Sequence, residues 1–98
     1  MITAKAYSKG AELLVAAADE DLLGKTFKSD GLTITVSRSF YEGECCDEEG
    51  LVNRLRMATM ANLVGEKTVA IAVKHGIIDP ESILMIGGVP HAQMVRMV

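Results

Sequence analysis

Residues 86–95, with the sequence IGGVPHAQMV, contain the side chains best suited to chemistry. His91 has an unperturbed pKa of ~6.5, so it could act as an acid, a base, a metal ligand or a hydrogen-bond donor to an anion. Gln93 would share one side of a strand with His91 and could bind an amide, a base edge or a carboxylate. This segment is therefore the first candidate for a functional site.

The residues before His91 predict a rigid loop. Gly87 and Gly88 can adopt backbone conformations barred to other residues, while Pro90 fixes its own φ and holds Val89 extended. A phosphate-binding loop is excluded, because Pro90 removes an amide donor and no helix is predicted to start there. We expect the loop to present His91 at the end of a sheet.

Two roles remain open for His91. In the structural role, His91 donates a hydrogen bond to a backbone carbonyl and closes the end of the sheet. This role is the more common one, because buried polar groups usually have a hydrogen-bond partner within the protein. In the functional role it contacts a ligand, although the sequence places no second acid, base or nucleophile beside it. We therefore predict binding residues here and no catalytic residue.

A second segment, NLVGEK at residues 62–67, could complete a site with this loop. Asn62 is predicted to cap the junction between two helices. If that junction faces the loop, Asn62, Lys67 and His91 line one shallow cleft. The predicted binding residues are Asn62, Lys67, Gly87, Gly88, Pro90, His91 and Gln93.

The cysteines do not form a recognisable metal or thiol site. Cys45 and Cys46 are adjacent, which disfavours an ordinary disulfide, and no CxxC or HxxxH spacing links them to the histidines. The acids of CDEE raise the pKa of a thiol beside them, which argues against a nucleophile. We predict free thiols, no metal and no cofactor.

The first half of the chain reads mainly as extended structure. Residues 2–7 alternate in polarity and an apolar run fills 12–18, so the turn SKG between them predicts a hairpin. Asp19 is a helix N-cap signal for about one turn at 20–23. Residues 32–36, after the turn KSDG, alternate most clearly and predict a strand with one packed face.

After Asp47, which is a good helix N-cap, the apolar residues recur at helical spacing. A helix is expected over 48–61 and a second over 63–75, with Gly76 as its left-handed cap. Then follow one helical turn from Pro80, a buried strand at 83–86 and a closing strand at 94–98. The predicted fold class is α+β, a mostly antiparallel sheet with two helices packed on one face.

Length and composition predict a single domain over residues 1–98 with an aliphatic core. The net charge of −3 disfavours nucleic-acid binding by the whole surface. A local basic patch would need several cations on one face, drawn from Lys25, Lys28, Arg38, Arg54 and Arg56. Neither a signal peptide nor an apolar stretch near the ~20 residues of a membrane span is visible, so we expect a cytoplasmic protein without a membrane partner.

Four segments in order carry a resemblance to a known family. They are LLGKTF (22–27), SFYEGE (39–44), ANLVGE (61–66) and IGGVPHAQMV (86–95). Together they resemble the small archaeal proteins grouped as domain of unknown function 424, over nearly the whole chain. The resemblance implies an association with translation and RNA binding, and supplies no catalytic residues to transfer.

We therefore predict a non-catalytic binding module associated with translation, which contacts RNA or a ribosome-associated protein. The alternative is a protein-interaction or assembly module, such as a homodimer that pairs through an exposed sheet edge. An enzyme that uses His91 comes third, because no catalytic partner for it can be named.

Overall fold

The structure, a computed structural model, describes residues 1–96. Its main sheet has six strands, in the spatial order β5 (Glu44–Cys46), β1 (Ile2–Lys9), β2 (Glu12–Asp19), β6 (Met60–Val64), β8 (Val89–Val95) and β7 (Leu84–Ile86). Neighbouring strands are antiparallel except β2 and β6, which are parallel. The other elements of the described residues are a separate hairpin, three α-helices and two 3-10 turns. The hairpin consists of β3 (Thr26–Ser29) and β4 (Leu32–Thr35), the helices are α1 (Arg38–Tyr41), α2 (Glu48–Met57) and α3 (Glu66–Lys74), and the 3-10 turns are Glu20–Leu22 and Pro80–Ser82.

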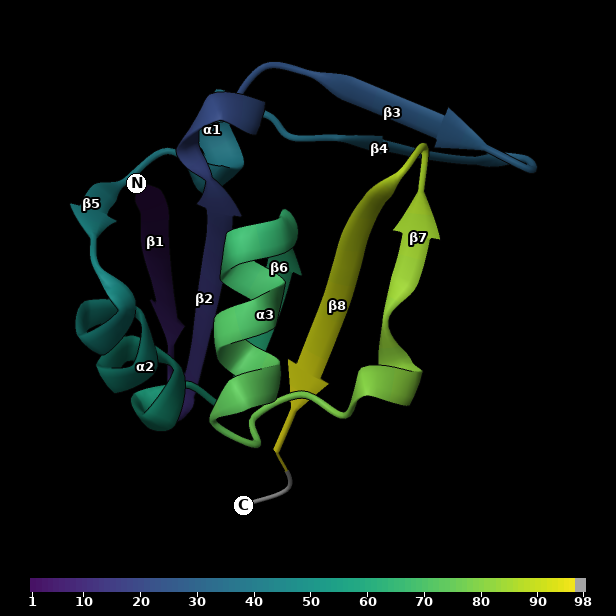
Figure 1. Ribbon diagram of the computed structural model, residues 1–98. Coiled ribbons are helices and arrows are strands. Elements are labelled where there is room, and N and C mark those ends of the chain that lie inside the picture. Colours follow the sequence, from purple (N-terminus) through teal and green to yellow (C-terminus); the bar gives the residue numbers. More distant parts are fainter. Residues whose placement is uncertain (97–98) are drawn as a thin grey trace.

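The helices α2 and α3 pack on one face of the main sheet, as Figure 1 shows. Leu51 and Leu55 of α2 and Val69 and Ala72 of α3 are buried in the larger core, against inward side chains of the strands. The predicted α+β class, with a mostly antiparallel sheet and two helices on one face, is confirmed.

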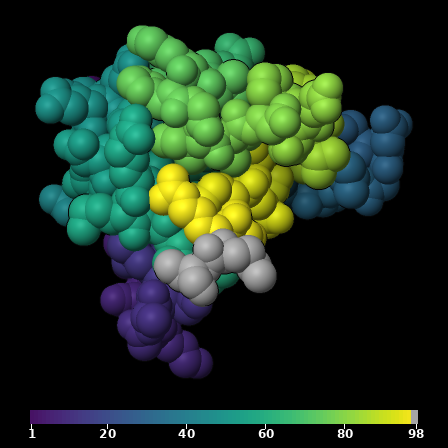
Figure 2. Space-filling view, turned by 90° about the horizontal axis from the view of Figure 1, so that it is seen from below, coloured from purple at the N-terminus to yellow at the C-terminus, as the bar shows by residue number. Residues whose placement is uncertain are grey.

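The opposite face of the main sheet is covered only in part. Residues 22–41, which include the β3–β4 hairpin and α1, fold over it and form a smaller core. Leu23, Val36 and Tyr41 of this segment pack against Ala18 and Val64. Figure 2 shows the helices on one side of the molecule and the purple tip of the β1–β2 hairpin projecting on the other.

The strand with the clearest alternation lies outside the main sheet. Residues 32–35 form β4, which pairs only with β3, through a turn in which Asp30 and Gly31 both have positive φ. Strict alternation of polar and apolar residues is typical of a two-stranded ribbon that has one face exposed to solvent. A central strand is buried on both faces, so its sequence does not need to alternate. The predicted turn at 28–31 is therefore right, but this strand was not expected to stand apart from the sheet.

The predicted junction between two helices is in fact a central strand. The helix expected over 48–61 ends at Met57, and the one expected over 63–75 begins at Glu66. β6 lies between them. Ala61 and Leu63 of β6 point toward the helices and are apolar. Their positions also fit the helical spacing of the apolar residues in α2, so the sequence pattern alone does not show where the helix ends and the strand begins.

Two distant residues fix the point where α2 ends. Thr59 exchanges hydrogen bonds with Leu13, its N–H donating to the Leu13 carbonyl at 2.9 Å and its Oγ1 accepting from the Leu13 N–H at 2.8 Å. Arg96 donates from Nη1 to the carbonyls of Leu55, Arg56 and Ala58. The guanidinium thus caps the negative end of the helix dipole.

The closing strand begins earlier than predicted. β8 starts at Val89 and continues to Val95, so only the first two residues of the expected strand at 94–98 lie within it. Met97 and Val98 lie outside the described residues.

Candidate functional site

The segment IGGVPHAQMV forms a hairpin turn and a strand. Gly87 and Gly88, with φ of 58° and 82°, connect β7 to β8 as a two-residue turn. Positive φ at both central residues matches the twist of the flanking strands, which is why glycine is needed at both places. His91 was expected at the end of the sheet, but it lies within β8 and is paired with a strand on each side, while Gln93 shares its side of the strand as expected.

His91 lies on the strand next to the β7 edge of the sheet, opposite Val64 of β6 and Leu84 of β7. By the alternation of β8, its side chain points away from α3, on the same side as Val89 and Gln93. Its imidazole is partly buried, and this burial lowers its pKa below the ordinary value. His91 is therefore a neutral, half-buried group near neutral pH.

Two of the predicted site residues meet on this face. Asn62 and Gln93 are opposite each other on β6 and β8, and Gln93 Nε2 donates to Asn62 Oδ1 at 2.9 Å. Asn62 is thus a strand residue and caps no helix, contrary to its predicted role. The pair borders a shallow hollow of about 210 Å³, here called the open sheet face, lined by Leu14, Met60, Ala61, Asn62, Gln93, Met94 and Val95.

Lys67 is not part of this hollow. It lies in the first turn of α3, on the opposite side of the sheet, so the predicted cleft of Asn62, Lys67 and His91 does not form. Pro90 also faces the helix side, and its carbonyl accepts a hydrogen bond from Gly65 N–H at 2.9 Å. The predicted residues divide between two faces.

The helix side carries a different surface around α3. A buried carboxylate, Asp19, fixes the start of the helix by accepting from the N–H groups of Lys67 and Thr68 at 3.1 and 2.9 Å. This cap comes from the end of β2, whereas the sequence assigned Asp19 to the turn that follows it. In that turn Asp19 makes no side-chain capping bond.

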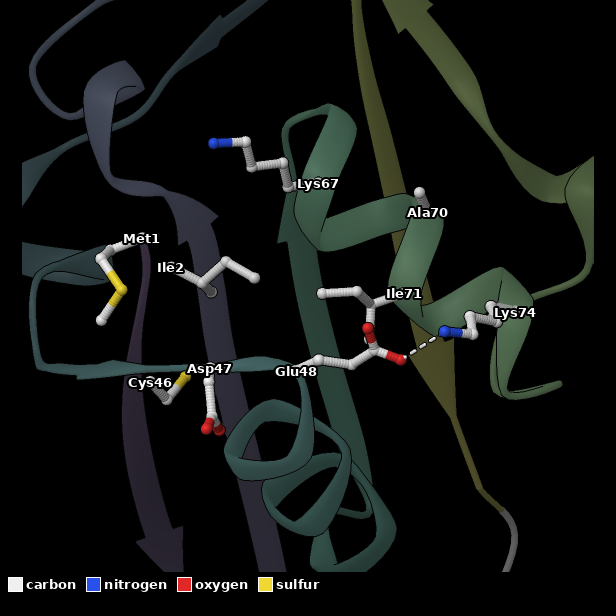
Figure 3. Close-up of a pocket in the computed structure, with 9 residues that line it drawn as sticks. All are labelled: Met1, Ile2, Cys46, Asp47, Glu48, Lys67, Ala70, Ile71 and Lys74. Carbon is white, nitrogen blue, oxygen red and sulfur yellow. Dashed lines mark hydrogen bonds and ion pairs between the residues drawn. The ribbon is translucent and has the colours of Figure 1, made fainter.

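A groove runs along one flank of α3, between that helix, β1 and the start of α2. It has a volume of about 380 Å³ and is here called groove A. Figure 3 shows Ile71 and Ala70 of the helix on one side and Met1, Ile2 and Cys46 on the other. The remaining lining residues are Asp47, Glu48, Lys67 and Lys74.

A second groove, groove B, runs along the other flank of α3 and has a volume of about 420 Å³. It exists because two helices cannot cover six strands, so the sheet beside β7 has no helix above it (Figure 1). The lining residues are Glu66, Val69, Ala70, Val73, Lys74, Ile83, Met85 and Pro90. Ala70 and Lys74 line both grooves, so the two apolar flanks meet at the exposed side of α3.

One charged cluster lies beside these grooves. Glu48 Oε2 accepts from Lys74 Nζ at 2.8 Å and lies 2.9 Å from His75 Nε2, which joins the start of α2 to the end of α3. These two hydrogen bonds lower the pKa of the Glu48 carboxyl group. Glu66, at the other end of α3, takes part in none of the ion pairs among residues 1–96.

The basic side chains do not converge on one face. Arg54 and Arg56 belong to α2 in the helix layer, whereas Lys25, Lys28 and Arg38 belong to the segment that folds over the opposite face. The condition that the sequence set for a basic nucleic-acid patch is therefore not met by these five residues.

The cysteine sulfurs point apart. Cys45 and Cys46 are neighbours on β5, so their side chains lie on opposite faces of the sheet. Cys45 Sγ donates to Glu20 Oε2 at 2.7 Å, and this bond raises the pKa of the exposed thiol. Burial raises the pKa of Cys46. Residues 1–96 contain no group of three or more histidine, cysteine or acidic side chains placed to hold a metal ion.

Lys67 and Pro90 were the only predicted site residues on the helix-side surface, and Met85 and Ala70 were missing from the prediction. Met85 is 56% exposed beside groove B, yet the run ILMI reads as a buried strand. Ala70 reads as one more apolar helix residue, but it lies on the exposed side of α3. The available signal was the charged pair Glu66 and Lys74 on either side of Ala70, which marks the outer side of the helix.

The fold and these surfaces define a small α+β protein with a six-stranded sheet, one layer of helices and grooves on both sides of α3. The chain belongs to the family described as Protein of unknown function (DUF424), whose model matches residues 7–97. This confirms the resemblance found from the four motifs. None of the curated proteins matches the chain.

A solved structure shares this fold. It is the crystal structure of an uncharacterized conserved protein from Methanopyrus kandleri, which is 28% identical to this chain with a TM-score of 0.81. The match covers 99% of this chain and 95% of that one. No helix within residues 1–96 is long and apolar enough to cross a membrane.

Proposed function

We propose that this protein is a non-catalytic binding module and that the apolar surface around α3 contacts another protein. The observation that carries the proposal is the convergence of grooves A and B at Ala70. Contiguous exposed apolar surface rimmed by charge is typical of interaction sites and uncommon elsewhere on monomeric proteins. Here the rim charges are Glu66, Lys67 and Lys74.

The chemistry of the two grooves supports protein recognition over catalysis. Groove B is lined by valine, isoleucine, methionine and proline side chains, and its polar groups lie only at its ends. Groove A holds Glu48, whose pKa is lowered, but this carboxylate is bound by Lys74 and His75. Both bonds go to Oε2 and join the start of α2 to the end of α3, which supports a structural role for this carboxylate.

RNA binding is the second candidate, and the open sheet face supports it. Side-chain amides such as those of Asn62 and Gln93 can hydrogen-bond base edges, and single-stranded RNA is commonly bound on exposed sheets. The family resemblance suggests RNA or a translation-associated protein as the partner. Against RNA stands the separation of the basic side chains, because phosphate contacts dominate nucleic-acid affinity.

The test uses one variant on each face. Met85→Lys places a charge beside groove B, and Gln93→Lys places one on the open sheet face; both residues are exposed, so the fold should tolerate both changes. Tagged wild-type protein and both variants are used to capture proteins from the native host. We expect Met85→Lys to lose captured proteins that Gln93→Lys retains, and the reverse pattern would contradict the proposal.

RNA binding is measured separately with total RNA at low and moderate salt. Affinity that falls steeply with salt, and that Gln93→Lys alters while Met85→Lys does not, would favour the open sheet face. No binding at low salt would eliminate the RNA candidate.

A further inference from the structure

The exposed side of α3 carries a row of three residues at a spacing of four. Glu66, Ala70 and Lys74 are all exposed, and residues four apart lie above one another on a helix. The smallest side chain is in the middle, and the two ends have opposite charge. If two such rows lie side by side in opposite directions, the Glu66 of each row is next to the Lys74 of the other.

This self-complementarity matters for a pair of identical helices. In the commonest class of helix packing, rows of residues four apart on the two helices lie along each other. If two copies of α3 cross at Ala70 in opposite directions, Glu66 of each copy falls beside Lys74 of the other. A two-fold axis through the crossing point makes the two Glu66–Lys74 contacts identical, and the same surface is used on both copies.

We infer that the α3 surface binds a second copy of this chain, as a two-fold antiparallel pair of α3 helices centred on Ala70. This inference rests on the proposed function and names the protein that the surface binds. Ala70 allows close approach of the two helices, because each copy contributes only a methyl group at the crossing point.

The charges around the contact are compatible with this pairing. Glu66 has no ion-pair partner within residues 1–96, so it is available to a second copy. Lys74 is held by Glu48 at 2.8 Å, but its ammonium group has three donors and can bond both carboxylates. Lys67 lies on the groove A side, 3 residues from Ala70, and Val73 lies on the groove B side at the same spacing.

The apolar flanks would be covered by the same pairing. Val73 and Met85 of groove B lie on one side of the row, and Ile71 of groove A lies on the other. Facing copies bring groove B against groove B, which removes apolar surface from water. This arrangement differs from the expected pairing through a sheet edge, because it joins side chains of two helices and not the main chains of two strands.

The decisive experiment uses charge reversal with sedimentation velocity over a range of concentrations at low salt. Wild-type protein should form a dimer. Glu66→Lys alone and Lys74→Glu alone place like charges together, and each should weaken self-association by about tenfold or more. An equal mixture of the two variants should form a heterodimer, because both cross-contacts again join opposite charges.

A second pair of variants controls for folding. Ala70→Arg should abolish the dimer, whereas Asn53→Arg, on the exposed side of α2, should leave it intact. Thermal melting of each variant shows whether Lys74→Glu, which also loses the contact with Glu48, remains folded. If it does not, Ala70→Arg against Asn53→Arg still decides the question.

The outcomes separate this inference from the proposed function. A wild-type monomer at high concentration, or a dimer that Ala70→Arg does not affect, would overturn the homodimer. If the protein is monomeric but Met85→Lys still loses a captured protein, the surface binds a different protein and the proposed function stands. If neither dimerisation nor capture responds to changes in the α3 surface, both fail.

Discussion

Asp19 at the end of β2 accepts hydrogen bonds from the N–H and the hydroxyl of Thr68, at 2.9 and 2.8 Å, across 49 residues of sequence. Both residues are buried, at 7% and 0% exposure. The bond ties the last residue of a central strand to the first turn of α3, so the strand sets where the helix begins. The exposed side of α3 depends on this position.

Asp19→Ala should therefore destabilise the protein. The change removes the acceptor for two N–H groups and one hydroxyl in a buried place, which we expect to cost about 2 kcal/mol in the free energy of unfolding. Urea denaturation measures the loss. Asp21→Ala, two residues away and exposed, is the control and should change stability by less than about 0.5 kcal/mol. Equal losses would show that the cap is unimportant.

Gly65→Ala should be still more damaging, because Asp19 approaches it closely. Gly65 has φ of 110°, and a Cβ there would lie within 2.4 Å of the Asp19 carboxyl carbon. We expect a loss of more than about 3 kcal/mol, from backbone strain and displacement of the cap together. Gly76→Ala is the matched control, since it has φ of 70° but nothing within 4 Å, and should cost about 1 kcal/mol in urea denaturation. Similar losses in the free energy of unfolding at both positions would mean that backbone strain alone explains the effect of Gly65→Ala, without displacement of Asp19.

The features predicted from the sequence are those with local causes. Asp47 caps α2 by accepting from Gly50 N–H at 2.8 Å, three residues away, and Gly76 ends α3 with positive φ. The β1–β2 hairpin and the turn at Pro80 were predicted because their polar and apolar patterns, or their Asp-Pro signal, lie within a few residues. Such signals need no knowledge of the rest of the chain.

The features that were wrong have distant causes. Thr59 and Arg96 end α2 through partners 46 and 41 residues away, so β6 could not be separated from the helix by spacing alone. For the site, the sequence identified Asn62, His91 and Gln93, which do lie on one face of the sheet. It also placed Lys67 with them, on the condition that a junction between two helices faced the loop, but β6 takes the place of that junction.

Glu48→Gln should lower thermal stability at neutral pH but not in strong acid. The pKa of Glu48 is lowered from its ordinary 4.5 by its bonds to Lys74 and His75. The folded state therefore holds the proton less tightly than the unfolded state, so the stabilisation is complete above about pH 4.5 and disappears as pH falls through the lower folded value.

The measurement is the melting temperature at pH 7 and pH 2.5. The difference between wild type and Glu48→Gln should be present at pH 7 and small at pH 2.5. Glu49→Gln, an exposed neighbour in the same helical turn, should show less of this pattern. A difference that persists unchanged at pH 2.5 would indicate packing and not the ionised carboxylate.

Cys45 should react slowly with alkylating reagents despite its exposure. Its hydrogen bond to Glu20 raises the pKa of the thiol, and only the thiolate is nucleophilic. Glu20→Gln removes the negative charge and should increase the rate of alkylation by iodoacetamide at pH 8, followed by peptide mass spectrometry. Asp21→Asn in the same turn should leave the rate nearly unchanged. A rate insensitive to both changes would show that Glu20 does not control the thiol.

His91 should make the protein less stable as pH falls below neutrality. Burial lowers its pKa in the folded state, so between that value and the ordinary ~6.5 the unfolded chain binds the proton more tightly. Stability is then greatest above about pH 6.5 and declines as pH falls toward the folded pKa. Because this effect needs only a half-buried imidazole, it tests the position of His91 independently of any ligand.

The experiment compares free energies of unfolding in urea at pH 7.5 and pH 5.5. His91→Gln should show a smaller decrease between the two pH values than the wild type, because glutamine does not titrate. Gln93→Ser, on the same face of β8, should retain the wild-type decrease. If His91→Gln and the wild type lose the same stability, the imidazole takes up its proton equally well in the folded and the unfolded chain, which would contradict a half-buried position for His91.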